Sequence, residues 1–119
     1  MKRREAFLYL TTIGHKSGQP HEIEIWYVEH GAGFYLCAEG HERAHWVQNI
    51  LAQPQVTFSV GTRDDPQALV PRSAAKARPL HAERDRRLHH LVTQLFQGKY
   101  GWSSGLLVEV MPLEEAPED

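Results

Sequence analysis

Residues 11–21 read TTIGHKSGQPH, and the rest of the chain is arranged on either side of this stretch. Gly14 and Gly18 allow backbone angles that other residues resist, so the chain can turn here and expose successive N–H groups. The stretch also supplies an ammonium, imidazoles and a hydroxyl, from His15, Lys16, Ser17 and His21. Such donors together suit an anion such as a phosphate. A solvated hairpin turn is the alternative interpretation of the same residues.

The stretch is not a nucleotide-binding P-loop of the Walker type. That motif places Gly directly before Lys-Ser, with another Gly five residues earlier and a helix after it. Here His15 precedes Lys16, and the residues after Pro20 alternate in polarity as a strand does. The sequence therefore argues against nucleotide hydrolysis.

Composition points to a small intracellular protein. The chain has 119 residues, which fits a single domain over residues 1–119. Its formal net charge is -2 with eight His counted as neutral, so we expect no binding to nucleic acid. The one cysteine, Cys37, lies in an apolar run, which indicates a buried, inert thiol in a reducing compartment. We see no signal peptide or membrane-spanning run, and expect a cytoplasmic protein without a membrane span.

The sequence pattern predicts strands interspersed with two helices. Period-two alternation at two stretches, together with turn signals and strand-favouring residues elsewhere, predicts six strands, at residues 6–12, 22–29, 34–38, 55–60, 67–78 and 106–111. The first three follow one another through short turns, which favours an antiparallel meander. Apolar residues at helical spacing predict helices over residues 43–52 and about 79–97. We therefore expect a small antiparallel β-barrel with attached helices, an α+β fold.

Residues 41–45 read HERAH and match the zinc-hydrolase pattern H-E-x-x-H. On a helix, His41 and His45 would share a face, with Glu42 as a general base. A catalytic zinc also needs a third protein ligand, and none stands out at a recognised spacing. Gly40 directly precedes the match, so the segment is as compatible with a loop as with a helix. We predict no metal site and keep a zinc hydrolase as the weakest alternative.

Two tryptophans and an asparagine are candidate ligand contacts. Trp46 and Asn49 lie three residues apart on the predicted helix 43–52, so an aromatic ring and an amide can meet the same ligand. Packing in the core is the alternative for Trp46. Trp26 lies opposite Ile23 and Ile25 on its predicted strand, where it forms either a second apolar face or a ligand wall.

Two ordered motifs make the chain resemble a known family. Residues 10–21 read LTTIGHKSGQPH, where the deazaflavin (F420)-dependent nitroreductase and quinone reductase family usually shows Thr-Thr-x-Gly-Arg-Lys-Ser/Thr-Gly-x-Pro-Arg. Residues 46–56 read WVQNILAQPQV and resemble that family's Trp-x-x-Asn-Leu-x-Ala-Asn-Pro-x-Val. The family lies within the split β-barrel superfamily of flavin reductases and pyridoxamine phosphate oxidases. The resemblance thus implies a six-stranded antiparallel split β-barrel, FMN-binding-like, that assembles as a homodimer.

The resemblance also implies a site and a reaction. The residues carried over as cofactor-binding are His15, Lys16, Ser17, Gly18, His21, Trp26, Trp46 and Asn49. Lys16, Ser17 and His21, with His15, would hold the phosphate and tail of coenzyme F420. Trp46 and Asn49 would flank the same site, and Trp26 would lie near the ring. Hydride would pass from reduced F420 to a quinone, a nitro compound or a similar small-molecule electron acceptor. The cofactor carries that chemistry, and no catalytic acid or base is assigned to the chain.

The chain departs from the family pattern at its anion-binding stretch. His15 and His21 stand where the family has Arg, and Glu24 stands where Pro is usual. Imidazoles are only partly charged at neutral pH, whereas Arg is always charged. Two alternatives to F420 therefore stay open. One is an FMN-dependent split-barrel oxidoreductase, and the other is a split barrel that binds a flavin or another ligand without catalysis.

Overall fold

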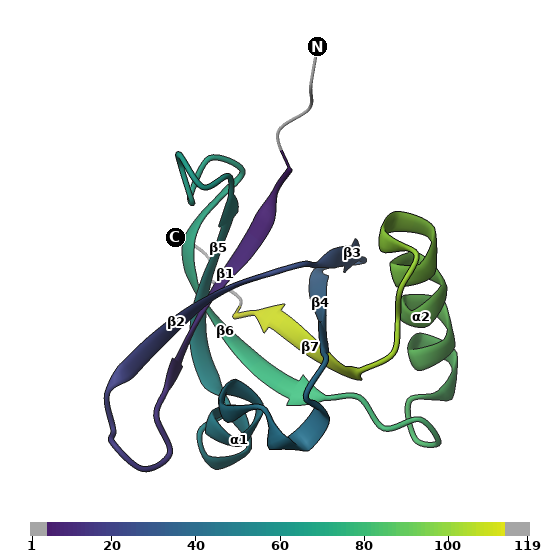
Figure 1. The fold of residues 1–119 in the computed structure, drawn as a ribbon, viewed down its shortest axis with the longest axis horizontal. Helices are drawn as coiled ribbons and strands as arrows, with labels where there is room; N and C mark the ends of the chain where they lie inside the picture. Colours follow the sequence, from purple (N-terminus) through teal and green to yellow (C-terminus); the bar gives the residue numbers. More distant parts are fainter. Residues whose placement is uncertain (1–4, 114–119) are drawn as a thin grey trace, which may run out of the picture.

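The computed structural model describes residues 5–113, which form one curled antiparallel sheet with two α-helices against it (Figure 1). The strands are β1 Phe7–Ile13, β2 Pro20–Ile25, β3 Val28–His30, β4 Gly33–Ala38, β5 Gln55–Gly61, β6 Val70–Pro79 and β7 Leu106–Pro112. The helices are α1 His45–Ala52 and α2 Arg86–Tyr100, with a short 3-10 turn, η1, at His41–Arg43. The order in the sheet is β2-β1-β5-β6-β7-β4-β3, and each neighbouring pair runs antiparallel.

The two ends of the sheet come together because the outermost strands are consecutive in the chain. Only Trp26 and Tyr27 separate β2 at one edge from β3 at the other. The sheet must therefore curl until its two edges lie within reach of that short connection. Figure 1 shows β2 sweeping across the other strands to reach β3. Since β2 and β3 are the two ends of the hydrogen-bonded order within residues 5–113, the barrel stays split between them.

The predicted antiparallel split β-barrel with helices is confirmed, but part of the strand assignment is wrong. The described part of the chain has seven strands, because the predicted strand 22–29 divides into β2 and β3. Both hairpins of the predicted meander form, β1 with β2 and β3 with β4, but the division places them at opposite ends of the sheet, so the three predicted strands are not continuous neighbours. The physical reason lies at Tyr27. Its backbone N–H and C=O are hydrogen-bonded to the Tyr100 hydroxyl, so they cannot continue the ladder of β2.

Apolar side chains fill both faces of the curled sheet. The barrel interior contains Leu8, Leu10, Phe34, Leu36, Phe58, Val60, Val108 and Val110. On the outer face, α2 covers a second cluster that includes Val28, Tyr35, Cys37, Val92, Phe96 and Leu107. The prediction that Cys37 is a buried thiol is confirmed, and burial raises its pKa to about 11. The thiol is therefore protonated near neutral pH and a poor nucleophile.

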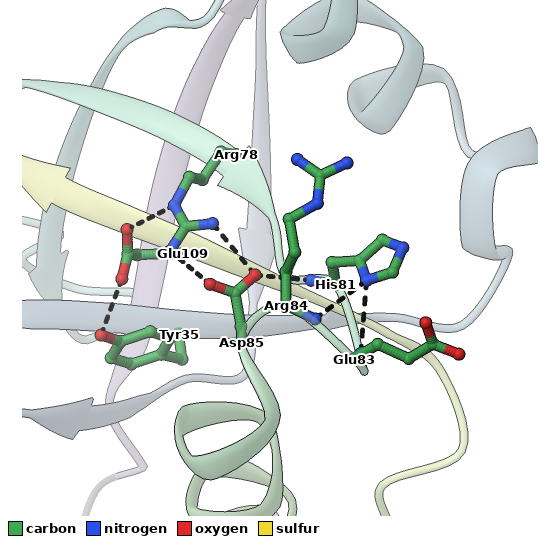
Figure 2. A network of polar contacts seen from close by, with 7 residues as sticks. All are labelled: Tyr35, Arg78, His81, Glu83, Arg84, Asp85 and Glu109. Carbon is green, nitrogen blue, oxygen red and sulfur yellow. Dashed lines mark hydrogen bonds and ion pairs between the residues drawn. The ribbon is translucent and has the colours of Figure 1, made fainter.

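The second helix begins later than the sequence predicts. Pro79 ends β6, and the chain turns through residues 81–85 before α2 begins at Arg86. Figure 2 shows why: the Asp85 carboxylate accepts the His81 backbone N–H at 2.8 Å and binds the Arg78 guanidinium at 3.1 and 3.2 Å. Hydrogen bonds from Arg78 lower the pKa of Asp85. The turn is thus held by side chains that helical spacing alone does not reveal.

The same arginine ties three strands to the start of α2. Arg78 on β6 donates from Nε to Glu109 on β7 at 3.0 Å, and Glu109 also accepts from the Tyr35 hydroxyl on β4 at 3.0 Å (Figure 2). Glu109 is only 9% exposed, so its charge needs these partners. The network fixes α2, whose last residues reach the site described next.

Candidate functional site

The loop between β1 and β2 is closed by its own backbone. Gly14 N–H donates to the Gln19 carbonyl at 2.8 Å, and Gly18 N–H donates to the Gly14 carbonyl at 2.9 Å. Gly18 has a φ of 71°, a left-handed conformation that favours glycine. Ser17 Oγ accepts the Gln19 N–H at 3.2 Å and lies 3.3 Å from His21 Nε2. The loop is therefore a defined turn that gathers its polar side chains on one side.

The side chain of Asn49 on α1 holds this loop in place through hydrogen bonds. Its Oδ1 accepts the His15 backbone N–H at 2.9 Å and lies 2.7 Å from His15 Nδ1. Its Nδ2 donates to Thr12 Oγ1 at 3.0 Å. Asn49 is 4% exposed, so its amide is taken up by contacts within the protein. Asn49 borders the site, but its polar atoms face the loop.

A cleft of about 580 Å³ lies between the loop and α1. It is lined by Thr12, Gly14, His15, Lys16, Ser17, His21, Glu22, Ile23, His45, Trp46, Gln48 and Asn49. A Cβ on Gly14 would collide with Ser17 Oγ and His21 Nε2, so glycine is needed here for those side chains to converge. We call this space the loop cleft. It brings together six of the eight residues predicted to bind a cofactor: His15, Lys16, Ser17, His21, Trp46 and Asn49.

The other two predicted residues lie elsewhere. Gly18 forms the tip of the loop and is outside the lining of the loop cleft. Trp26 lies in a second cleft of about 660 Å³, which we call the aromatic cleft. This cleft is lined by Phe7, Glu24, Ile25, Trp26, Cys37, Ala38, Glu39, Gly40, Trp46, Tyr100 and Trp102. Trp46 borders both spaces, so the two clefts meet at its side chain.

The aromatic cleft has a rigid wall that the sequence did not predict. Trp26 stacks on Tyr100 with ring centroids 4.4 Å apart and an angle of 3° between the ring planes. The Tyr100 hydroxyl accepts the Tyr27 N–H at 3.1 Å and donates to the Tyr27 carbonyl at 2.9 Å. Lys99 Nζ donates to the same carbonyl at 2.8 Å. Residues at the end of α2 thus bind the connection between β2 and β3 and hold Trp26 in place.

Tyr100 and Trp102 are not among the predicted site residues, because the predicted second helix ends at residue 97. In the structure α2 continues to Tyr100 and ends at Gly101, whose φ is 68°. Two large aromatic residues on either side of a glycine were the available signal, since such a pair after a helix often packs on a neighbouring surface. What the pattern could not reveal is that their partners are Trp26 and Tyr27.

The HERAH segment does not form the helical zinc motif. His41 belongs to η1 and has a φ of 52°, Ala44 is extended, and His45 begins α1. The two histidines therefore do not share a helix face, which the zinc-hydrolase alternative requires. Among residues 5–113, no group of three or more His, Cys, Asp or Glu side chains could hold a metal ion.

The curled sheet and its two adjoining clefts define a split β-barrel of the pyridoxamine phosphate oxidase type, and three solved structures share it. The heme storage protein HutZ from Vibrio cholerae is 19% identical, with a TM-score of 0.70 over 95% of this chain and 84% of HutZ. A putative pyridoxamine 5'-phosphate oxidase from Listeria innocua is 16% identical, with a TM-score of 0.61 over 91% and 84%. The F420-H2 dependent reductase FDR-A is 23% identical, with a TM-score of 0.55 over 87% and 92%. At these identities the likeness establishes the fold alone.

Residues 2–106 match the family model described as F420H(2)-dependent quinone reductase. The chain belongs to this family, so the predicted resemblance is confirmed. Membership supports F420-dependent reduction of quinones or similar acceptors. Comparison with curated proteins finds no match. Within residues 5–113, neither helix is long and apolar enough to cross a membrane.

Proposed function

We propose that this protein is itself an active reductase, which binds F420 across the two clefts and reduces a quinone or a similar acceptor. The observation that carries the proposal is the meeting of the clefts at Trp46. One cleft collects groups that bind anions, and the other collects aromatic side chains. A cofactor with a phosphate-bearing tail and a flat ring needs these two environments side by side.

The donors of the loop cleft fit a phosphate. Lys16 supplies an ammonium, Ser17 a hydroxyl, and His15 and His21 supply imidazoles, all from one short loop and the strand after it. Gly14 leaves the space in which these groups converge. Glu22 also lines the cleft, and Arg72 Nη2 lies 3.7 Å from its carboxylate, which partly offsets that charge. Lys16 supplies the ammonium of the loop cleft and would carry most of the binding energy.

The aromatic cleft fits a flat ring. Trp26, Trp46, Tyr100 and Trp102 offer ring faces and edges, and aromatic rings pack favourably on such surfaces. Reduced F420, when bound, would supply the hydride. The protein would orient the ring against the acceptor and exclude water from the space between them.

Tyr100 would position the ring and would not serve as a proton donor. Its hydroxyl hydrogen is directed to the Tyr27 carbonyl, and burial raises its pKa. Both features keep the phenol protonated and engaged with the backbone. Its contribution to the site is therefore the face that it presents to Trp26.

We also propose that the protein works as a homodimer. A solved structure described as a domain-swapped dimer shares the fold, with a TM-score of 0.60 and 20% identity over 92% of this chain. Leu51 and Leu69 are 57% and 63% exposed, and a second copy would cover such side chains. Light scattering during gel filtration tests this proposal. A mass of one chain at micromolar concentration would contradict it.

The experiment that tests the function is oxidation of reduced F420 by a panel of quinones and nitro compounds, followed by absorbance. We expect acceptor-dependent turnover by the wild-type protein and by Lys76→Ala, which removes an exposed lysine on β6 outside both clefts. Lys16→Ala should raise the concentration of F420 needed for half-maximal rate about tenfold, the effect of losing one charge-assisted hydrogen bond to phosphate. Ligand binding without turnover for any acceptor would favour the non-catalytic alternative.

A further inference from the structure

The side-chain amide of Asn49 has one orientation that satisfies its neighbours. The His15 backbone N–H can only donate, so the Asn49 atom 2.9 Å from it must be the carbonyl oxygen Oδ1. Nδ2 then points the other way and donates to Thr12 Oγ1 at 3.0 Å. Because Asn49 is 4% exposed, water does not compete for these bonds. The backbone of the loop therefore fixes which end of the amide faces His15.

This orientation determines the proton position on the imidazole of His15. Oδ1 of Asn49 lies 2.7 Å from Nδ1 of His15, and an amide oxygen accepts hydrogen bonds but never donates. Nδ1 must therefore carry a proton at every pH at which the contact exists. In the neutral ring the other nitrogen, Nε2, is then an acceptor without a hydrogen. His15 is exposed and lines the loop cleft, so Nε2 is the polar ring atom left for a ligand.

An ionised phosphate oxygen also only accepts hydrogen bonds, so it repels the lone pair of neutral Nε2. Protonation of Nε2 gives both an N–H donor and a positive charge toward the phosphate. We infer that Asn49 is a positioning residue that locks His15 in the Nδ1–H tautomer and makes it a phosphate ligand only as the imidazolium. The nature of the ligand rests on the proposed function, whereas the tautomer rests on the Asn49 contacts alone.

Other charged groups face the same space and contribute to any pH profile. Lys16 on the loop and Glu22 on β2 also line the loop cleft. His21 on β2 and His45 on α1 line it as well. The His15 contribution must therefore be isolated by a substitution that acts on His15 and leaves the other histidines unchanged.

The first test is a long-range proton–nitrogen NMR spectrum of the 15N-labelled protein without ligand at about pH 8, where imidazoles are mostly neutral. The signals of His15 are assigned by their absence in His15→Gln. We expect the pattern of a neutral ring protonated at Nδ1. A ring protonated at Nε2 would overturn the inference. This result does not depend on F420, so its failure is separate from failure of the proposed function.

The second test measures F420 affinity by fluorescence between about pH 5.5 and pH 8.5, the range in which imidazoles change charge. Asn49→Asp keeps an acceptor for both His15 donors, and the Thr12 hydroxyl can turn to donate to the second carboxylate oxygen. The added negative charge stabilises the imidazolium, so the pH at which affinity is half lost should rise by about one unit. His90→Gln, on the exposed face of α2, is the matched control and should leave the profile unchanged.

The outcomes of the second test distinguish the phosphate role of His15 from the binding of F420 itself. An unchanged midpoint in folded Asn49→Asp would overturn the phosphate role of His15 while leaving F420 binding intact. Absence of F420 binding at every pH would refute the proposed function and with it the phosphate half of the inference. In that case the NMR spectrum still decides the tautomer.

Discussion

Replacing Tyr100 with Phe removes a single hydroxyl that holds the connection between β2 and β3. That hydroxyl accepts the Tyr27 N–H at 3.1 Å and donates to the Tyr27 carbonyl at 2.9 Å. Tyr27 is 7% exposed, so its N–H would be left buried without a partner, whereas the carbonyl would keep Lys99 Nζ at 2.8 Å. We expect the free energy of unfolding to fall by about 2 kcal/mol, the penalty for one unsatisfied buried donor. For a chain of this size the melting temperature should fall by about 8 °C.

Tyr100→Phe and Tyr100→Leu together separate the hydroxyl from the ring. In the wild-type protein the rings of Trp26 and Tyr100 stack with centroids 4.4 Å apart. Phe keeps this stack, so the wall of the aromatic cleft should be retained. Leu removes that stack as well, which should raise the F420 concentration needed for half-maximal rate about two- to tenfold, the equivalent of an aromatic pair. Circular dichroism gives the melting temperatures, and the F420 assay gives the kinetics. Unchanged stability of Tyr100→Phe, or unchanged kinetics of Tyr100→Leu, would refute this account of the wall.

Three further predictions concern Arg78, Lys16 and His15. Arg78→Met should lower the free energy of unfolding in urea by about 2 kcal/mol, because it leaves the buried charge of Glu109 without its cationic partner. Adding Glu109→Gln should recover part of that loss. Arg78 lowers the pKa of Asp85, so that pair stabilises the fold fully above about pH 4 and loses its effect as pH falls further; the deficit of Arg78→Met should therefore be smaller at about pH 3. Lys16→Ala should weaken F420 binding more than His15→Gln does, and an equal loss would contradict the leading role of the ammonium. His15→Arg should tighten binding at about pH 8 and flatten the pH profile, whereas a steeper profile would contradict our account of His15.

Local patterns predicted the barrel and the polar loop well. The turn at Gly14 and Gly18, the alternation in β5 and the strand-favouring residues of β1, β4 and β7 are local features of the sequence, and the structure forms the turn and all four strands. The order of motifs around the loop and α1 also identified the family, because two separate stretches agreed with it. The convergence of six predicted residues on one cleft follows from the antiparallel return of β2 beside β1 and the position of α1 below it.

Contacts between distant residues determined what the sequence could not predict. The break after β2 depends on Tyr100, which is 73 residues from Tyr27, and the apolar residues 25–28 at the break are equally typical of a continuing strand. The late start of α2 depends on Asp85 and its partner Arg78 on β6. The inward orientation of the Asn49 amide depends on the loop that it anchors, 34 residues away. Each of these features depends on a side chain that binds a backbone group or a charged group far away in the sequence. The spacing of apolar residues carries no information on such contacts.

The central claim is that this chain binds F420 across the loop cleft and the aromatic cleft. Its most direct test is the parallel titration of cofactor-free protein with F420 and with FMN, read through tryptophan and cofactor fluorescence, since Trp26 and Trp46 line the proposed site. We predict saturable F420 binding at micromolar concentration, weaker binding of FMN, and loss of F420 affinity in Lys16→Ala but not in Lys76→Ala. Tighter binding of FMN would keep the fold and reassign the cofactor. Binding of neither compound would contradict the claim.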